Sequence, residues 1–345
     1  MPSATPGAAS AATAAGAAAP VPPYRAPAWL PGGHAQTIYP FFLPRPALTY
    51  RRERIDTPDG DFWDLDWLDP PGGAAARVPT VILFHGLEGG SGSHYARNLM
   101  AEAAALGWRG VIPHFRGCSG EPNRFPRAYH SGDHEEVGAM LAAVHARVHD
   151  RESGLPLYAV GVSLGGSALL NWLGRAGAGA RAVLAAAAAV SAPLDLTQAG
   201  AAIDRGLNRI YAAHFLWTLR PKGLSLAERF PGSVDPERIR RARSMYEFDD
   251  AVTAPLHGFD GTADYWHRAS SKPWLRQVAV PTLVLNARND PFGPAASLPH
   301  TGEVAPDVLL EQPAGGGHVG FLVGPFPGHL RWLPRRLVQF FVARR

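Results

Sequence analysis

Cysteine is almost absent from this chain, since Cys118 is the only one in 345 residues. A single cysteine cannot form an intramolecular disulfide, which excludes a small secreted scaffold held together by disulfides. Charged residues are also sparse, at 18%, and the net charge is only +4. The basic residues are spread along the chain without interleaved aromatic residues, so we expect no nucleic-acid partner.

The chain also lacks a long apolar run and a basic N-terminal signal region. No window of about 18 strongly apolar residues is present, so we expect no stable membrane insertion. The first basic residue is Arg25, and residues 1–23 are almost entirely alanine, proline and other small residues. This composition predicts a disordered leader over residues 1–26 instead of a signal peptide, and we expect a cytoplasmic location.

The remaining sequence has the composition of a globular protein with a sizeable core, with 46% hydrophobic residues. Residues 48–67 predict an antiparallel pair that turns at Pro58-Asp59-Gly60. Buried apolar runs then alternate with helical stretches, which predicts a mostly parallel sheet covered on both faces, an α/β fold. The strands expected after this hairpin cover residues 79–85, 109–114, 157–162, 182–190, 281–286 and 307–311. The expected helices cover residues 95–106, 133–148, 165–173 and 330–341.

This alternation is interrupted between residues 195 and 271, where the chain is more helical and rich in Arg, Trp and Tyr. An insertion between two parts of a parallel sheet is best explained as a cap over the carboxyl edge of its strands, where ligands bind in open α/β sheets. We therefore expect a core formed by residues 27–194 and 272–345, with a helical cap at 195–271.

The strongest local motif is GVSLG at residues 161–165, between an expected strand and an expected helix. A strand that reverses into a helix within two residues strains the serine and projects its hydroxyl over the sheet edge. Small residues on both sides leave room for this turn. The motif predicts a nucleophile elbow with Ser163 as the nucleophile of acyl transfer.

Acyl transfer also needs amide donors for the negative charge that develops on the carbonyl oxygen. In a fold of this kind, one amide follows the nucleophile and another lies in the loop after the third strand. These positions predict the N–H groups of Leu164 and Leu87 as the oxyanion hole. His85 and Gly86 could also serve as a tight exit from the strand.

An acid and a base follow in the chain order that this fold requires. Asp290 follows an expected strand and is the candidate acid that orients an imidazole, while His318 lies in a glycine-rich loop after the last strand and is the candidate base. Asp249 and Asp250 are competitors for the acid, although they lie in the irregular region and not at a strand end.

The sequence resembles the YheT-like branch of the α/β hydrolases over about residues 27–341. This branch includes bacterial YheT-type hydrolases, yeast medium-chain fatty-acid ethyl-ester synthase/esterases and mammalian abhydrolase-domain phospholipases. The matching strings are GHAQT at 33–37, HGLEG at 85–89, HFRGCSGEPN at 114–123, YHSG at 129–132, GVSLGG at 161–166, FDD at 248–250, DPF at 290–292 and GGHVGF at 316–321.

The resemblance implies that Ser163, Asp290 and His318 form the charge relay, in agreement with the local motifs. One departure is Asn289, where the family commonly has an acidic residue, but this position is not the expected triad acid. Eukaryotic relatives have an N-terminal membrane anchor, whereas this chain begins with its Ala/Pro-rich leader, so their membrane location is not carried over.

We therefore expect a serine carboxylesterase that acts on small-molecule acyl esters of short to medium chain length, through an acyl-enzyme and without a cofactor. Acyl transfer to an alcohol uses the same intermediate and is one alternative. A non-catalytic binding protein of the same fold is the other, although an intact Ser–Asp–His set argues against it.

Three weaker patterns favour structural roles. The cluster His130, Asp133, His134 and Glu135 could suggest a metal site, but its first part is expected to be a loop, so we expect no metal. Nothing marks Cys118 as a stabilised thiolate nucleophile. Arg116 and Glu121 are expected to pair and to pin the loop beneath the active site.

Overall fold

The computed structural model describes residues 20–152 and 154–344. Most of the expected leader, residues 1–19, lies outside the described part of the chain. The rest of it packs on the folded body, because Tyr24 is buried and its hydroxyl donates to the Leu322 carbonyl at 2.9 Å. Its ring also meets Trp332 edge-on, with ring centroids 4.9 Å apart. Within the described part, the expected leader up to residue 26 is therefore ordered.

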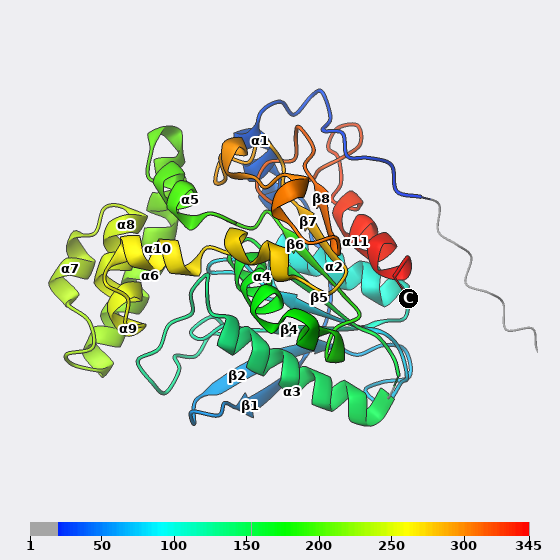
Figure 1. Ribbon diagram of the computed structural model, residues 1–345, viewed down its shortest axis with the longest axis horizontal. Helices are drawn as coiled ribbons and strands as arrows, with labels where there is room; N and C mark the ends of the chain where they lie inside the picture. Colours follow the sequence, from blue (N-terminus) through cyan, green and yellow to red (C-terminus); the bar gives the residue numbers. More distant parts are fainter. Residues whose placement is uncertain (1–19, 153, 345) are drawn as a thin grey trace, which may run out of the picture.

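An eight-stranded sheet forms the centre of the molecule, in the order β1-β2-β4-β3-β5-β6-β7-β8 (Figure 1). The first two strands form the expected antiparallel hairpin, and β2 also runs antiparallel to β4. All later pairs are parallel, as the alternating pattern predicts. The strands are β1 Arg51–Asp56, β2 Phe62–Leu68, β3 Thr80–Phe84, β4 Arg109–Pro113, β5 Leu157–Val162, β6 Ala186–Val190, β7 Thr282–Leu285 and β8 Val308–Glu311.

Helices cover both faces of this sheet, and the side chains of β3 show how. Ile82 and Phe84 belong to a core cluster with residues of α3 (His134–Glu152) and α4 (Leu164–Ala176). Val81 and Leu83, which point the other way, belong to a cluster with α2 (His94–Ala105) and α11 (Trp332–Val342). Alternate residues of one strand are thus buried on opposite faces, which is why the parallel strands read as continuous apolar runs.

Two boundaries differ from the expected ones by four residues, and the others by three or fewer. The strand expected to begin at residue 182 begins only at Ala186, because residues Gly177–Ala182 form a 3₁₀ turn after α4. The helix expected to end at residue 148 continues to Glu152. Both changes lie at the end opposite the elbow and leave the site residues in place.

The segment from residue 195 to 271, called the helical segment below, contains six α-helices and gathers beside the sheet (Figure 1, green to yellow). They are α5 Leu196–Ile203, α6 Arg209–Arg229, α7 Pro236–Arg241, α8 Met245–Phe248, α9 Ala254–Leu256 and α10 Thr262–Ala269. A π-helical turn, Asp249–Thr253, joins α8 to α9. The segment has its own apolar clusters, one of which centres on Leu216, Ile239 and Phe248. No helix in the described residues is long and apolar enough to cross a membrane.

Candidate active site

Ser163 lies between β5 and α4 in a strained backbone conformation, with φ 53° and ψ −121°. The turn is possible because the residues two before and two after Ser163 are glycines. A Cβ on Gly161 would lie 2.5 Å from the Gly165 carbonyl oxygen, and a Cβ on Gly165 would lie 2.5 Å from the Phe84 carbonyl oxygen. The GVSLG motif therefore folds into the sharp strand-to-helix turn that the sequence predicts, with the serine at its tip.

His318 lies between the two other candidate residues and contacts both. Its Nε2 is 2.9 Å from the Ser163 Oγ, and its Nδ1 is 2.8 Å from the Asp290 Oδ2. Since a carboxylate only accepts, Nδ1 carries a proton and Nε2 is left to accept one from the serine. The other carboxylate oxygen, Oδ1, accepts from the Phe292 amide at 2.8 Å, and Asp290 is buried. The three residues thus form one continuous chain of hydrogen bonds.

The loop that carries His318 is held by α1 (Gly33–Ile38), a contact that local sequence reasoning missed. The His318 amide donates to the Thr37 hydroxyl at 2.8 Å. Gln36 Oε1 accepts from the Asn289 side chain at 2.9 Å, which links the histidine loop to the acid loop. A Cβ on Gly320 would lie 2.0 Å from the Gln36 carbonyl oxygen, so only glycine fits there. The signal for this contact in the sequence was the string GHAQT at residues 33–37, which matches the family although no local structural pattern explains it.

The two amides expected to form the oxyanion hole both border the same cavity as Ser163. The amide of Leu164 opens α4 and, like other first-turn amides, has no partner within the helix. The amide of Leu87 donates to no acceptor in the part of the chain that the structure describes. Gly86 brings this loop against the nucleophile, since a Cβ there would lie 3.1 Å from the Ser163 Cβ. Leu87 and Leu164 thus remain the candidate residues for an oxyanion hole.

His85 holds the start of the oxyanion loop as a neutral side chain. Its Nε2 accepts from the Phe115 amide at 3.1 Å, so its Nδ1 donates to the Gly86 carbonyl at 2.8 Å. Complete burial lowers the pKa of His85 to about 3, which keeps the ring uncharged. His85 thus has a structural contact on both sides, and the tight strand exit considered from the sequence is present.

The competing acids do not contact His318 in the described structure. The Asp249 carboxylate is buried in the helical segment, where it accepts from the Thr253 hydroxyl at 2.7 Å and the Trp266 Nε1 at 2.9 Å. Asp250 pairs with Arg238. Of the three candidate acids, only Asp290 reaches the imidazole.

The other weak patterns prove to be structural contacts. No group of three or more His, Cys, Asp and Glu residues suited to a metal ion occurs among the described residues. The His130 ring meets His257 with ring centroids 4.4 Å apart. Burial raises the pKa of the Cys118 thiol to about 12, so this thiol stays protonated at neutral pH.

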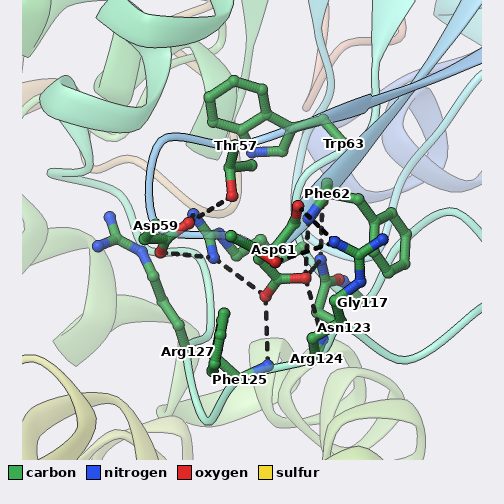
Figure 2. Close-up of polar contacts among 12 residues, drawn as sticks. Thr57, Asp59, Asp61, Phe62, Trp63, Gly117, Asn123, Arg124, Phe125 and Arg127 are labelled. Carbon is green, nitrogen blue, oxygen red and sulfur yellow. Dashed lines mark hydrogen bonds and ion pairs between the residues drawn. The ribbon is translucent and has the colours of Figure 1, made fainter.

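The loop after β4 is fixed by a buried polar network around Asp61 (Figure 2). The Asp61 Oδ1 accepts from the Phe62 and Arg124 amides and from the Asn123 side chain, each at 2.9 Å. The Phe125 amide also faces the second carboxylate oxygen, at 3.3 Å. This network anchors residues 123–125, of which Asn123 and Phe125 line the cavity near Ser163.

The expected pair between Arg116 and Glu121 is wrong. Arg116 pairs with Asp59 at 3.0 Å, with Asp61 at 3.1 Å and with Glu136 at 2.9 Å, whereas Glu121 pairs with Arg54 at 2.8 Å. The physical reason is burial, because the buried guanidinium of Arg116 lies against the buried carboxylates of Asp61 and Glu136, whereas Glu121 is exposed. The loop is pinned as expected, but from the β1–β2 turn and α3.

A cavity of about 690 Å³ lies over Ser163, His318 and the two candidate oxyanion amides. Its far wall comes from the helical segment. The apolar side chains there are Phe215, Leu219, Leu226, Phe230, Met245, Phe248 and Val252. The site therefore combines a candidate nucleophile, base and acid with a largely apolar chamber.

Comparison with known proteins identifies the family of the chain. The model of the alpha/beta hydrolase fold family matches residues 79–325, and the chain belongs to this family, in its YheT-like branch. It is 37% identical to YheT of Escherichia coli (strain K12), over 90% of each chain. It is 34% identical to the phospholipase ABHD3 of Mus musculus, over 91% of this chain and 77% of that protein. These relatives place it among the esterase- and lipase-like hydrolases.

A solved structure of the same fold is the Pyrococcus furiosus esterase Pf2001. The two chains superpose with a TM-score of 0.54 over 86% of this chain and 93% of that one, at 15% identity. At this identity the likeness concerns the fold alone. The fold class and the family branch expected from the sequence are both confirmed.

Proposed function

We propose that this protein is a serine carboxylesterase in which Ser163, His318 and Asp290 form the catalytic triad. The observation that carries the proposal is the unbroken chain of contacts from the Ser163 Oγ through His318 to Asp290. A strained serine at a helix N-terminus, with a histidine at 2.9 Å, is the arrangement that acyl transfer requires. The membership of an esterase- and lipase-like family supports it.

The reaction proceeds in two steps. The Ser163 Oγ attacks the ester carbonyl carbon while the His318 Nε2 accepts its proton, and Asp290 stabilises the imidazolium. The amides of Leu87 and Leu164 donate to the carbonyl oxygen as it becomes negative. Collapse of the tetrahedral intermediate breaks the bond to the alcohol, which takes the proton from His318. A water then repeats the sequence on the acyl-enzyme and releases the acid.

We propose further that the helical segment is a cap that shapes the acyl site, and that the preferred substrates are short- to medium-chain esters. Its apolar side chains form one wall of the cavity, and a volume of about 690 Å³ limits the length of chain that can be buried there. Each buried CH₂ contributes up to about 0.8 kcal/mol until the cavity is filled. The substrate partner is therefore a small-molecule ester. The cytoplasmic location expected from the sequence stays a prediction.

The decisive experiment is labelling with a fluorophosphonate, read by intact mass. The wild type should gain one adduct, and Ser163→Ala should gain none while kcat falls about 10⁴-fold or more. Ser167→Ala is the matched control, because Ser167 lies one helical turn further on and donates to the Pro193 carbonyl instead. Full labelling of Ser163→Ala would assign the nucleophile elsewhere, and an unlabelled wild type would favour a binding protein.

A second assay separates hydrolysis from acyl transfer. The purified protein is given p-nitrophenyl esters with and without ethanol, and both the free acid and the ethyl ester are measured. We expect the free acid as the main product, since water reaches the same acyl-enzyme. A dominant ethyl ester at low ethanol concentration would assign the protein as an acyltransferase instead.

A further inference from the structure

Helix α6 makes polar contacts with two of the loops that form the candidate site. Near its N-terminus, the Asn208 side chain donates to the Pro291 carbonyl at 2.6 Å, directly after Asp290. Further along, the Lys222 ammonium lies 2.8 Å from the Glu88 carboxylate, directly after Leu87. The same helix thus touches the acid loop and the oxyanion loop.

Glu88 is held in an unusual position for an acidic residue. Its backbone has a positive φ of 56°, which a side chain of this kind rarely adopts. Its amide donates to the Tyr129 hydroxyl at 2.8 Å, and that hydroxyl donates back to the Glu88 Oε1 at 3.0 Å. Tyr129 itself stacks on Phe115 with ring centroids 5.2 Å apart. The carboxylate therefore has a fixed place, and only 11% of the side chain is exposed.

This arrangement places a negative charge one residue from a proposed oxyanion donor. An uncompensated carboxylate there would oppose the negative charge that develops on the substrate oxygen, because like charges repel more strongly where water is partly excluded. Lys222 is the cation that contacts Glu88. Since the lysine side chain is 46% exposed, its ion pair with Glu88 adds little to the free energy of unfolding. The consequence of this ion pair therefore lies in its effect on the site.

We propose that Lys222 is a positioning residue for the oxyanion hole. Its ammonium holds Glu88 and neutralises it, so that the Leu87 amide faces the substrate oxygen and that oxygen meets no second negative charge. Helix α6 thereby links the helical segment to the chemical step. This inference rests on the proposed esterase function.

The proposal predicts an unusual order among three variants. Lys222→Met leaves a bare carboxylate and should lower kcat about tenfold with KM nearly unchanged, less than the loss of a whole oxyanion donor. Glu88→Gln removes the charge but keeps an oxygen for Tyr129, and should cost less than about threefold. The double variant should be as active as Glu88→Gln, so removing the carboxylate rescues the loss of the lysine.

The experiment measures kcat, KM and the rate of fluorophosphonate labelling for these variants, because the phosphoryl oxygen occupies the oxyanion hole during labelling. Lys222→Arg should remain within about threefold of the wild type, since it keeps the charge. Arg240→Met is the matched control. It removes a cation that pairs with Glu237 within the helical segment and should leave both rates unchanged. Melting temperatures check that each variant is folded.

Each outcome decides the proposal. Equal labelling rates for the wild type and Lys222→Met would overturn it, and so would a double variant slower than Lys222→Met. If Lys222→Met does not fold, the comparison of the double variant with Glu88→Gln still tests the proposal. Equal rates for these two variants support the proposal, and a tenfold difference would overturn it. A wild type that is not labelled removes the proposed function together with this inference, whereas labelled variants with equal rates remove the inference alone.

Discussion

The sheet and the helical segment contribute to the cavity in different ways. The residues proposed to carry the chemistry all follow strands: Leu87 follows β3, Ser163 follows β5, Asp290 follows β7 and His318 follows β8. Their positions are set by the paired backbones of a parallel sheet. The apolar wall comes from helices of the segment, whose positions are set by side-chain packing in separate small clusters.

In the proposed function, the groups that carry out the chemical step lie at the ends of sheet strands. The shape of the substrate site is set by helices that pack in separate small clusters. A sheet buried on both faces holds its strand ends closely, which suits groups that must stay within hydrogen-bond distance of each other. A helical segment with its own clusters can change without disturbing those ends. Changes in the sheet region should therefore act on kcat and global stability, and changes in the segment should act on substrate range and local stability.

The largest expected effect compares two aspartates, one from each region. Asp290→Asn should lower kcat about 10⁴-fold, because the amide favours the wrong imidazole tautomer. Asp249→Asn should change kcat much less, since Asp249 contacts Thr253 and Trp266 and not the histidine. Steady-state kinetics on one ester check both. A loss at Asp249 equal to that at Asp290 would mean that the segment takes part in the chemistry.

The next effect compares two buried phenylalanines. Phe341 of α11 is fully buried and stacks on Tyr158 with ring centroids 4.7 Å apart, so Phe341→Ala should cost about 3–5 kcal/mol of global stability. Phe248→Ala should loosen the helical segment first. Hydrogen exchange read by mass spectrometry should show faster exchange over residues 205–256 in Phe248→Ala, with the sheet still protected. Equal loss of protection in the sheet would show that the two regions unfold together.

A smaller effect concerns the pH dependence of stability. Burial raises the pKa of Asp249 to about 6, helped by the nearby Asp204 and Asp250 carboxylates. The folded protein therefore binds a proton that the unfolded chain releases near its ordinary value of about 3.9, so stability is lost as pH rises through this window. The loss should total roughly 2–3 kcal/mol between pH 4 and pH 7. The free energy of unfolding in urea, measured at both pH values, should fall by this amount more in the wild type than in Asp249→Asn, because other carboxylates titrate in both proteins; an equal change in the two proteins would contradict the assignment.

The smallest expected effect is that of single methylene groups in the substrate. For p-nitrophenyl esters, kcat/KM should rise from C2 to about C4–C8 by up to ~0.8 kcal/mol per CH₂ and then fall. Phe215→Ala should move the optimum to longer chains, because Phe215 lines the cavity and lies 6.1 Å from Phe292 by ring centroids. Trp217→Ala is the control, since Trp217 is 74% exposed. An optimum that Phe215→Ala leaves unchanged would show that the segment does not set the chain length.

Much of the fold follows from local patterns. The buried strands read as apolar runs because both faces of the sheet are covered, as the opposite burial of Ile82 and Val81 shows. The hairpin turn and the elbow glycines have direct steric meaning in the sequence. The local pattern predicted the start of one strand too early, at residue 182 instead of Ala186. The reason is that the preceding 3₁₀ turn is as rich in alanine as the strand.

The contacts between residues far apart in the chain could not be predicted from local sequence patterns. Arg116 was expected to bond Glu121 five residues away, but its partners Asp61 and Glu136 are farther along the chain in both directions. Thr37 supports His318 across 281 residues, and Lys222 meets Glu88 across 134. Nothing local marks such pairs, because they depend on how whole elements pack.

The α/β class, the family and the chain order of the candidate nucleophile, acid and base follow from the sequence alone, because they depend on periodicity and on short motifs with a steric cause. The packed structure was needed to show that Asp290 and not Asp249 contacts His318, that α1 supports the histidine loop, and that Lys222 of α6 contacts Glu88. A short motif constrains the backbone within a few residues, whereas the partner of a charged side chain is chosen by burial and distance after the elements have packed.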